Sequence, residues 1–411
     1  SGERDGRGGT VLGDGAGGRL VACEVAADGR LATLEAPAFD RPLAGDMLGL
    51  GADRQGLLAV VSAHDSPEPI APSLQRFRPG ASEPETIELP SANHSDAGSI
   101  AVAYVDSDDY LDVFVAGRGI PSKFPQPASS WLLRGGPGGL KLDAEQSAVF
   151  ANIGLVTAAV FVNLDDDELP ELALATEWGP IRIFKNTGGK FTDATKAWGL
   201  DSRPGIWQTL AVGDFDNDGH QDIFITDMHS DMSEAVGPNR EKLKSNMKWD
   251  EKMLQSGGMS IFGNAFFRAL GDGKFEEVSD KIGAENYWPW GLSSGDLNAD
   301  GFIDVFIASS MNFPFRYGVN SLLLNDGGKR FEDSEFILGV EPRRGGRTAK
   351  PWFVLDPRGE DKDHALVAEY NLTEPVEIWG SLGTRASVIF DLDNDGDLDI
   401  VTNEFHDGPM V

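Results

Sequence analysis

One acidic unit recurs along this chain and limits what the chain can fold into. Its clearest copy begins at Asp214 and reads D-F-D-N-D-G-H-Q-D, followed by the apolar run I-F-I-T. Two closely matching copies begin at Asp296 and Asp391. In each copy, oxygen-bearing side chains occupy positions 1, 3, 5 and 9, glycine occupies position 6, and an apolar run follows. Regular recurrence of this kind is typical of a supersecondary unit that is repeated many times.

Four weaker copies extend the pattern and begin at Gly51, Tyr104, Asn163 and Asp356. Most neighbouring copies are separated by 51 to 60 residues, which is enough for a four-stranded propeller blade with long loops. Fifty glycines and 23 prolines indicate many tight turns. We therefore predict an all-β fold, a seven-bladed β-propeller formed by residues 1–411 as one domain.

The two ends of the chain are predicted to complete the last blade together. Residues 1–40 contain a hairpin pattern without a loop unit, and residues 386–411 supply only the inner strands of a blade. Pairing them would remove an open sheet edge. The pattern is interrupted at about residues 228–258, where helix formers and loose three-to-four apolar spacing predict a short helical insertion.

The loop side chains have the chemistry of calcium sites. Ca²⁺ prefers six to eight oxygen ligands and accepts carboxylates, carbonyls and water. We expect the side chains at positions 1, 3, 5 and 9 and the backbone carbonyl at position 7 to converge on one ion, with glycine permitting the turn. The predicted ligands in the three complete loops are Asp214, Asp216, Asp218, His220 and Asp222; Asp296, Asn298, Asp300, Phe302 and Asp304; and Asp391, Asp393, Asp395, Asp397 and Asp399.

Two further loops keep part of the ligand set. The first offers Asn163, Asp165, Asp167, the carbonyl of Leu169, and Glu171, but has Glu168 in place of the glycine. The second offers Asp106, Asp108 and Asp112, but begins with an aromatic residue. Both are predicted to be weaker sites.

The last two loops are not expected to bind metal. Arg358 is predicted to neutralise Asp356 and Glu360, because a guanidinium can replace a cation between carboxylates. The loop at Gly51 keeps only Asp53 among its ligands. We expect three to five calcium ions in total, with Mg²⁺ competing poorly because it requires stricter octahedral geometry.

The net charge limits the possible partners. With 66 acidic and 35 basic residues the formal charge is -31, whereas nucleic-acid binding requires a basic surface. No apolar run approaches the length of about 20 residues that a membrane helix needs. We therefore expect neither a nucleic-acid partner nor membrane insertion. The single cysteine, Cys23, excludes an intramolecular disulfide and does not decide the compartment.

The motif D-x-D-x-D-G-x-x-D followed by an apolar strand resembles FG-GAP/VCBS repeats, as in the head propeller of integrin α chains. Residues 152–200 more specifically resemble the cartilage-acidic-protein/UnbV group. The resemblance implies a seven-bladed propeller, calcium in the loops, and an exported protein that is extracellular, periplasmic or at the cell surface. Members of this group usually continue into a further C-terminal domain, and a function that resides there is not carried over.

No catalytic motif in the sequence accounts for the function. The chain has no H-E-x-x-H, G-x-S-x-G or P-loop pattern, and many of its acidic residues are assigned to the loops. We interpret it as a non-catalytic module that binds a protein or a glycan, or that takes part in assembly. A carbohydrate-active enzyme, either a glycoside hydrolase or a lyase, is an alternative, and so is a structural subunit of a larger extracellular or periplasmic complex.

A group of large side chains is predicted near the start of the innermost strands. It consists of Trp207, Tyr287, Trp288, Trp290 and Arg385. Tryptophan, tyrosine and arginine are enriched at binding hot spots, so these residues are candidates for a ligand or partner face. Ordinary packing between blades is the alternative.

Overall fold

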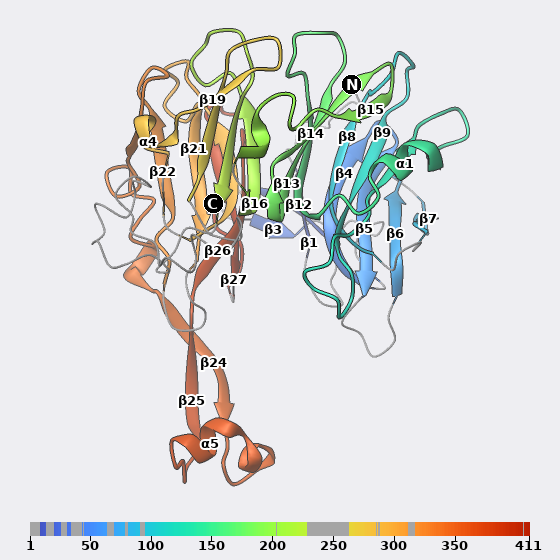
Figure 1. Cartoon of the computed structure of the whole chain (residues 1–411). Coiled ribbons are helices and arrows are strands. Elements are labelled where there is room, and N and C mark those ends of the chain that lie inside the picture. Colours follow the sequence, from blue (N-terminus) through green and yellow to red (C-terminus); the bar gives the residue numbers. More distant parts are fainter. Residues whose placement is uncertain are drawn as a thin grey trace.

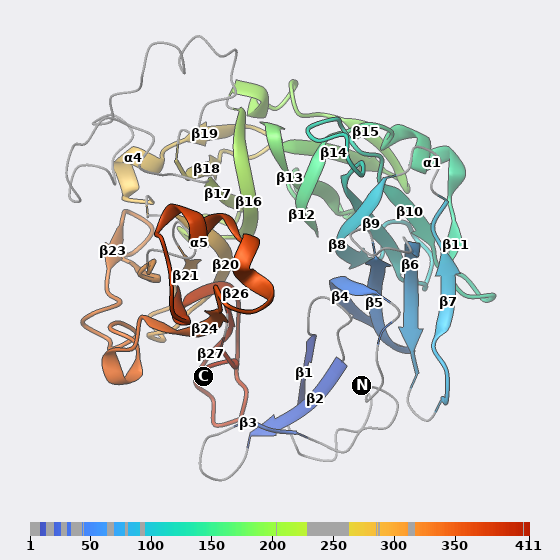
Figure 2. The same ribbon diagram turned by 90° about the horizontal axis from the view of Figure 1, so that it is seen from below.

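The chain folds as a β-propeller whose sheets are arranged around a central axis (Figure 1, Figure 2). The computed structural model describes residues 9–13, 20–25, 31–33, 43, 45–63, 70–78, 81–90, 95–202, 204–227, 263–284, 286, 288–310, 317–405 and 407–411. The predicted helical insertion at 228–258 and the predicted site residue Tyr287 lie outside these residues.

Five consecutive blades each contain four antiparallel strands. Blade 1 contains β4 (Asp46–Asp53), β5 (Gly56–Ala63), β6 (Ile70–Phe77) and β7 (Glu85–Glu88). Blade 2 contains β8 (Asp96–Ala103), β9 (Asp112–Gly119), β10 (Trp131–Arg134) and β11 (Lys141–Leu142). Blade 3 contains β12 (Leu155–Val162), β13 (Glu171–Pro180), β14 (Arg182–Thr187) and β15 (Lys190–Asp193). Blade 4 contains β16 (Pro204–Gly213), β17 (Asp222–Asp227), β18 (Ala265–Ala269) and β19 (Phe275–Glu277). Blade 5 contains β20 (Pro289–Gly295), β21 (Asp304–Ser309), β22 (Ser321–Asn325) and β23 (Phe331–Asp333).

Two smaller sheets occupy the remaining sector of the ring (Figure 2). One consists of β26 (Gly383–Phe390) and β27 (Asp399–Phe405), and the other of β1 (Gly9–Gly13), β2 (Leu20–Val25) and β3 (Leu31–Thr33). All of these sheets are antiparallel and lie around one axis, so the predicted all-β propeller fold is confirmed. No strand pairing joins the two smaller sheets within the part of the chain that the structure describes. That the ends complete one blade therefore stays a prediction.

The unit that begins at Asp356 corrects the sequence prediction, because it is not part of a blade. It lies at the turn of a two-stranded arm, formed by β24 (Ala349–Leu355) and β25 (Val376–Ser381), that projects from the propeller (Figure 1). The arm also carries the 3-10 helix η4 (Glu360–Asp363) and α5 (Ala365–Glu369). The other short helices are α1 (Ala144–Val149), α4 (Ser279–Ile282), η1 (Leu200–Ser202) and η3 (Arg344–Gly346).

The core consists of apolar layers between neighbouring blades. The second strand of blades 2 to 5 begins with six consecutive buried residues, because a blade in the ring is covered on both faces. The first strands pack against one another around the axis. Phe150 illustrates the layers: its ring contacts Phe114 of blade 2 and Phe184 of blade 3 edge to face, with centroids 5.2 Å and 5.0 Å away.

Replacing Phe150 tests this packing between blades. Because Phe150 is completely buried, Phe150→Ala should lower the free energy of unfolding by about 3–5 kcal/mol through lost burial and a residual cavity. Ile337→Ala is the matched control, since Ile337 is 84% exposed and its loss should cost no more than about 0.5 kcal/mol. Thermal and urea melts would measure both, and equal losses would contradict the assignment.

Candidate calcium loops

Five nine-residue loops connect the first strand to the second in blades 2 to 5 and in the sheet β26–β27. They begin at Tyr104, Asn163, Asp214, Asp296 and Asp391. The first strands lie side by side around the axis and run in the same direction, so these loops lie on one face of the ring. The arm joins the start of β26, whereas the loop follows its end. Arm and loops therefore belong to opposite faces.

Two residues turn the backbone in these loops. Position 4 has left-handed backbone, with φ between 56° and 63°, at Asp166, Asn217, Ala299 and Asn394. The glycines at position 6, which are Gly219, Gly301 and Gly396, have φ between 90° and 101°. The sequence predicted the glycine but missed position 4, although asparagine and aspartate tolerate this conformation better than most residues. Glu168 is accommodated because its φ is not positive.

The carboxylate at position 1 orders the loop. In the loop at Asp214, Oδ1 accepts the N–H of Asp218 at 3.0 Å and Oδ2 accepts that of Gly219 at 2.9 Å. Asp296 and Asp391 accept the same pair of N–H groups in their own loops. Three loops thus share one internal hydrogen-bond pattern and present the remaining oxygens on one side.

The carboxylate at position 9 attaches the loop to the sheet. Asp222 accepts the N–H of Phe215, at position 2, at 3.2 Å and that of Ala269, in the third strand, at 2.8 Å. The equivalents Asp112, Glu171 and Asp304 bind the same two places, and all four residues are completely buried. Their first role is therefore to hold loop and strand together.

Burial of these carboxyl groups changes their protonation. It raises the pKa of Asp222 and of Glu171 to about 7, and raises the pKa of Asp112 and Asp304 as well, although two backbone N–H groups oppose the shift in each case. Neighbouring loop carboxylates raise the pKa further. A cation in the loop would favour the ionised form of each group.

Asparagine side chains connect consecutive blades beside the loops. Asn325 of blade 5 donates to the carbonyl of Phe215 in blade 4 at 2.8 Å and to that of Ile303 at 3.0 Å. Asn186 of blade 3 donates in the same way to Val105 of blade 2 and to Pro170. A loop is therefore connected both to its own blade and to the next.

A cation from the third strand reaches position 3 in three loops. Arg268 Nε lies 2.9 Å from Asp216 Oδ2, Lys185 Nζ contacts Asp165 Oδ2, and Arg134 contacts Asp106. Each cation lies directly across the sheet from position 9. In blade 5 that place is held by Leu324 and position 3 is the uncharged Asn298. In blades 2 to 5, a cation is therefore found across the sheet where position 3 is an aspartate, and leucine is found there where position 3 is an asparagine.

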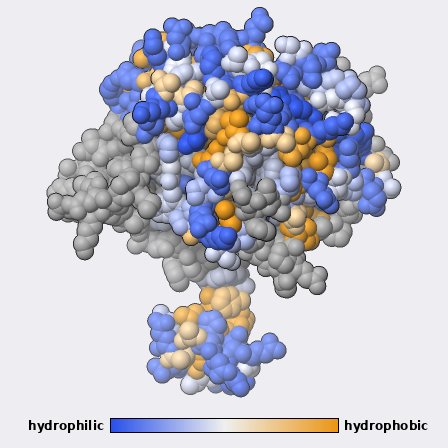
Figure 3. Space-filling model, turned by 45° about the vertical axis from the view of Figure 1, so that its right-hand side comes forward, coloured by the Kyte–Doolittle hydropathy of each residue, from blue (hydrophilic) through white to orange (hydrophobic). Residues whose placement is uncertain are grey.

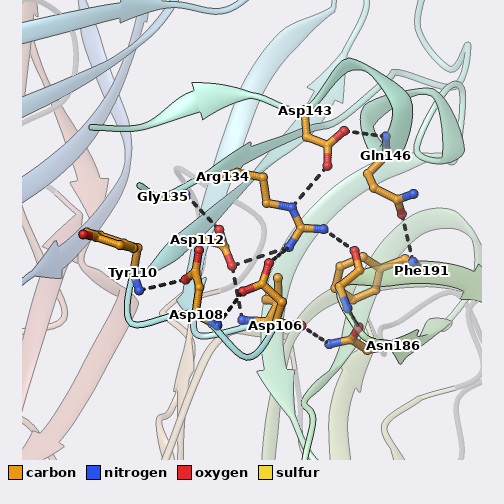
Figure 4. Close-up of polar contacts among 12 residues, drawn as sticks. Asp106, Asp108, Tyr110, Asp112, Arg134, Gly135, Asp143, Gln146, Asn186 and Phe191 are labelled. Atoms are coloured by element: carbon orange, nitrogen blue, oxygen red, sulfur yellow. Dashed lines mark hydrogen bonds and ion pairs between the residues drawn. The ribbon is translucent and has the colours of Figure 1, made fainter. Parts of the chain in front are cut away.

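In blade 2 this cation lies among the carboxylates of the loop and its surroundings (Figure 4). Arg134 Nη1 lies 3.4 Å from Asp106 and 3.5 Å from Asp112, and Nε lies 3.1 Å from Asp143. Its Nη2 donates to the carbonyl of Gly189 in blade 3. The N–H groups of Asp108 and Tyr110 donate to the side-chain oxygens of Asp106 and Asp108, as the corresponding N–H groups do in the loops at Asp296 and Asp391. Arg134 therefore pairs with two of the predicted ligands, and metal binding by Asp106, Asp108 and Asp112 stays a prediction.

Replacement of an ion by arginine was predicted at a different place. Arg358 was expected to neutralise Asp356 and Glu360, but its guanidinium lies 2.8 Å from Glu374, across the turn of the arm. That prediction is wrong, because the segment is a projecting hairpin and not a blade loop.

Three loops gather carboxylate oxygens within 4.8 Å of one another. The groups are Asp165, Asp167 and Glu171; Asp214, Asp216 and Asp218; and Asp391, Asp393 and Asp395. The fourth loop has Asn298 between Asp296 and Asp300. Asp165 Oδ1 and Asp216 Oδ1 are buried and have no hydrogen-bond partner. A buried carboxylate oxygen without a donor is costly unless a cation binds it, and these all-oxygen sets suit a hard cation such as Ca²⁺.

The position 7 residues are not among the carboxylate groups above, and the use of their carbonyl groups as ligands stays a prediction. His220 nevertheless has a contact that the sequence did not predict: its Nδ1 lies 3.1 Å from Asp166 Oδ2 in the loop of blade 3. That carboxylate raises the pKa of His220. Asn217 likewise donates to the carbonyl of Gly301 in blade 5 at 3.0 Å. The acidic loops therefore contact one another around the face.

The structure places the residues of the predicted ligand face in different surroundings. Trp207 is completely buried between blades 3 and 4, and its carbonyl accepts from Thr157 at 2.8 Å. Trp290 and Arg385 come together, with the guanidinium carbon 4.0 Å from the centre of the indole ring and 5.1 Å from that of Phe405. Burial lowers the pKa of Arg385. Trp288 is partly buried and its Nε1 has no hydrogen-bond partner.

Residues 163–225 and 256–307 match the family model of the FG-GAP-like repeat, and these segments contain the loops at Asn163, Asp214 and Asp296. The chain carries FG-GAP-like repeats. No curated protein matches it. Solved structures that resemble it include the rhamnogalacturonan lyase PL11 of Bacillus licheniformis, at 14% identity and a TM-score of 0.38 over 84% of this chain. The chain spans 62% of that lyase, and a likeness of this extent says nothing about activity.

A pair of substitutions separates the metal loops from the arginine-filled loop. Asp216→Asn should weaken one calcium site, whereas Asp106→Asn at the equivalent position of blade 2 should leave calcium binding unchanged. Both remove a carboxylate that pairs with an arginine, so the loss of that ion pair is common to the two variants. Equilibrium dialysis followed by metal analysis measures the bound ions. A similar decrease in both variants would contradict the assignment.

Proposed function

We propose that this chain is a calcium-stabilised, non-catalytic propeller that serves as a binding and assembly module outside the cytoplasm. Four loops, at Asn163, Asp214, Asp296 and Asp391, would each hold one ion. The loop at Tyr104 is left out because of Arg134. The loop at Gly51 is left out because Asp53 already accepts two backbone N–H groups and pairs with Arg76 at 2.6 Å.

The FG-GAP-like repeats support an exported location, since proteins with such repeats are commonly exported. The ligands at positions 3 and 5 come from short, solvent-facing turns, and a bound ion would hold such a turn against the blade that follows. Calcium sites of extracellular modules bind with dissociation constants of about 10⁻⁴–10⁻³ M, which suits a compartment rich in calcium. No helix in the described part of the chain is long and apolar enough to cross a membrane.

Calcium should raise the unfolding temperature of the protein. Each site that is saturated at about 100 times its dissociation constant adds roughly 2.7 kcal/mol to the free energy of unfolding. Differential scanning calorimetry with calcium, with magnesium at the same concentration, and with a chelator would measure the effect. We expect the highest unfolding temperature with calcium and a much smaller rise with magnesium. Identical melts with calcium and chelator would rule out the four sites.

The observation that carries the assembly role is the exposed apolar surface of the arm. Trp352 is 39% exposed, Val354 57% and Trp379 55%, although all three belong to strands. Figure 3 shows apolar side chains gathered where the arm leaves the propeller. A two-stranded hairpin is at best marginally stable in water by itself, and an exposed apolar patch of this kind is typical of an interaction site.

The charge of the arm indicates the chemistry of the partner. Residues 349–381 contain seven acidic and three basic residues. A second copy of this chain, with its net charge of -31, would bring like charges together. We therefore propose a protein partner with an apolar groove bordered by lysine or arginine. Trp288, Trp290 and Arg385 lie on the same face as the arm and would extend this contact surface.

Removing the apolar side chains of the arm tests this role. The double substitution of Trp352→Ala and Trp379→Ala should leave the unfolding temperature of the propeller unchanged, because the arm lies outside its core. It should abolish recovery of the partner from the native extracellular fraction. Binding of the partner to the wild-type protein should weaken with added salt, because salt screens the attraction between their charges. Ile337→Ala is the control, since it removes an exposed apolar side chain outside the arm. Equal recovery by the double variant would overturn the proposal.

A further inference from the structure

A small cavity lies where blades 1 and 2 meet on the loop face. It encloses about 200 Å³ between the β4–β5 turn, the loop that begins at Tyr104, and the turn after β10. Its walls include Arg54, Arg76, Tyr104, Asp109 and Tyr110, and Leu140 contributes an apolar surface. These two blades carry the loops to which no ion is assigned, so the cavity occupies the part of the face that lacks proposed metal sites.

The substitutions that remove metal ligands supply the walls of the cavity. Tyr104 stands at position 1, where the metal loops have aspartate or asparagine, and Asp109 stands at position 6, where three of them have glycine. Tyr104 and Tyr110 are each 37% exposed. The guanidinium carbon of Arg54 lies 5.6 Å from the ring centre of Tyr104 and helps to hold that ring in place.

A buried donor in the cavity wall lacks an acceptor. Arg76 is only 2% exposed; its Nη2 lies 2.6 Å from Asp53 Oδ2 and its Nη1 3.3 Å from Glu85 Oε2. Its Nε is buried and has no hydrogen-bond partner. An unsatisfied buried donor costs about 1–3 kcal/mol, and a ligand oxygen would have to displace the atoms that cover Nε in order to reach it.

The charges around the cavity favour a neutral ligand. The charge of Arg76 is already neutralised by Asp53 and Glu85, and Asp109 adds a carboxylate to the wall, so an anion gains little. Arg54 disfavours a cation because the two positive charges would repel each other. The remaining groups are an acceptor, a donor and two aromatic faces. Hydroxyl groups suit the first two, and apolar C–H faces suit the rings.

We propose that this cavity binds one neutral sugar residue at the end or branch of a glycan. A pyranose ring presents C–H groups on its faces and hydroxyl groups at its edge, which matches tyrosine walls combined with the carboxylate of Asp109 and the guanidinium of Arg54. The volume is below the range of about 300–1,000 Å³ that is usual for larger ligands, which limits the occupant to a single ring. This site deepens the binding role proposed above, and it does not involve the ions or the arm.

The proposal is tested by the binding of oligosaccharides to the full chain in a buffer that contains calcium. Isothermal titration with cellohexaose, mannohexaose, xylohexaose and maltohexaose as neutral probes, and with hexagalacturonate as an anionic probe, should show binding of at least one neutral probe. Tyr104→Ala and Tyr110→Ala should each weaken it about tenfold, equivalent to about 1.4 kcal/mol. Tyr370→Ala is the matched control, because Tyr370 is an exposed tyrosine at the tip of the arm.

Several results would overturn the sugar site. These are the absence of binding by every neutral probe, undiminished binding by both tyrosine variants, or a preference for hexagalacturonate. Thermal melts of the two variants should match wild type, because both rings are partly exposed, and this confirms that lost binding is not unfolding. Sugar binding that persists after loss of the arm tryptophans would separate this site from the partner surface, and the chelator melt tests the metal sites independently.

Discussion

A buried carboxylate at the start of the second strand connects the parts of each of blades 2 to 5. In blade 4 it is Asp222, whose two oxygens accept one N–H from the loop and one from the third strand. The group is desolvated, which raises its pKa, and the two hydrogen bonds hold it in the position where a cation would bind. One side chain therefore holds the loop to the sheet and is also a predicted metal ligand. Asp112, Glu171 and Asp304 repeat the arrangement.

Once that carboxylate is buried, the charge of the loop must be balanced, and the blades do this in different ways. Blade 2 uses Arg134 alone, which contacts three carboxylates. Blades 3 and 4 use Lys185 and Arg268 on one oxygen of the position 3 aspartate and leave the other oxygen buried without a partner. Blade 5 has an amide, Asn298, at position 3, and among its described residues no side-chain cation pairs with the loop. The more complete the internal compensation, the weaker the case for an ion.

The units that depart from the repeated acidic pattern lie in two neighbouring blades and in the arm. Tyr104 and Asp109 replace residues that a metal loop requires, and both line a cavity instead. The unit at Asp356 lies outside the ring, on a projecting hairpin that has exposed aromatic residues. The loops proposed to bind ions thus keep the blade architecture, while the surfaces proposed for recognition come from the other units.

The sequence by itself determined the repeat, the all-β propeller and the candidate ligands of the metal loops, because spacing and residue type are local properties. It also predicted the turn at Gly219 and its equivalents, since glycine readily adopts that conformation. Arg134, Lys185 and Arg268 could not be placed, because their partners are 20 to 52 residues away and meet them only across the sheet. The burial of Trp207, the pairing of Trp290 with Arg385 and the cavity beside Tyr104 were likewise decided by the tertiary structure. Each depends on contacts between blades, and such contacts exist only after the ring has formed.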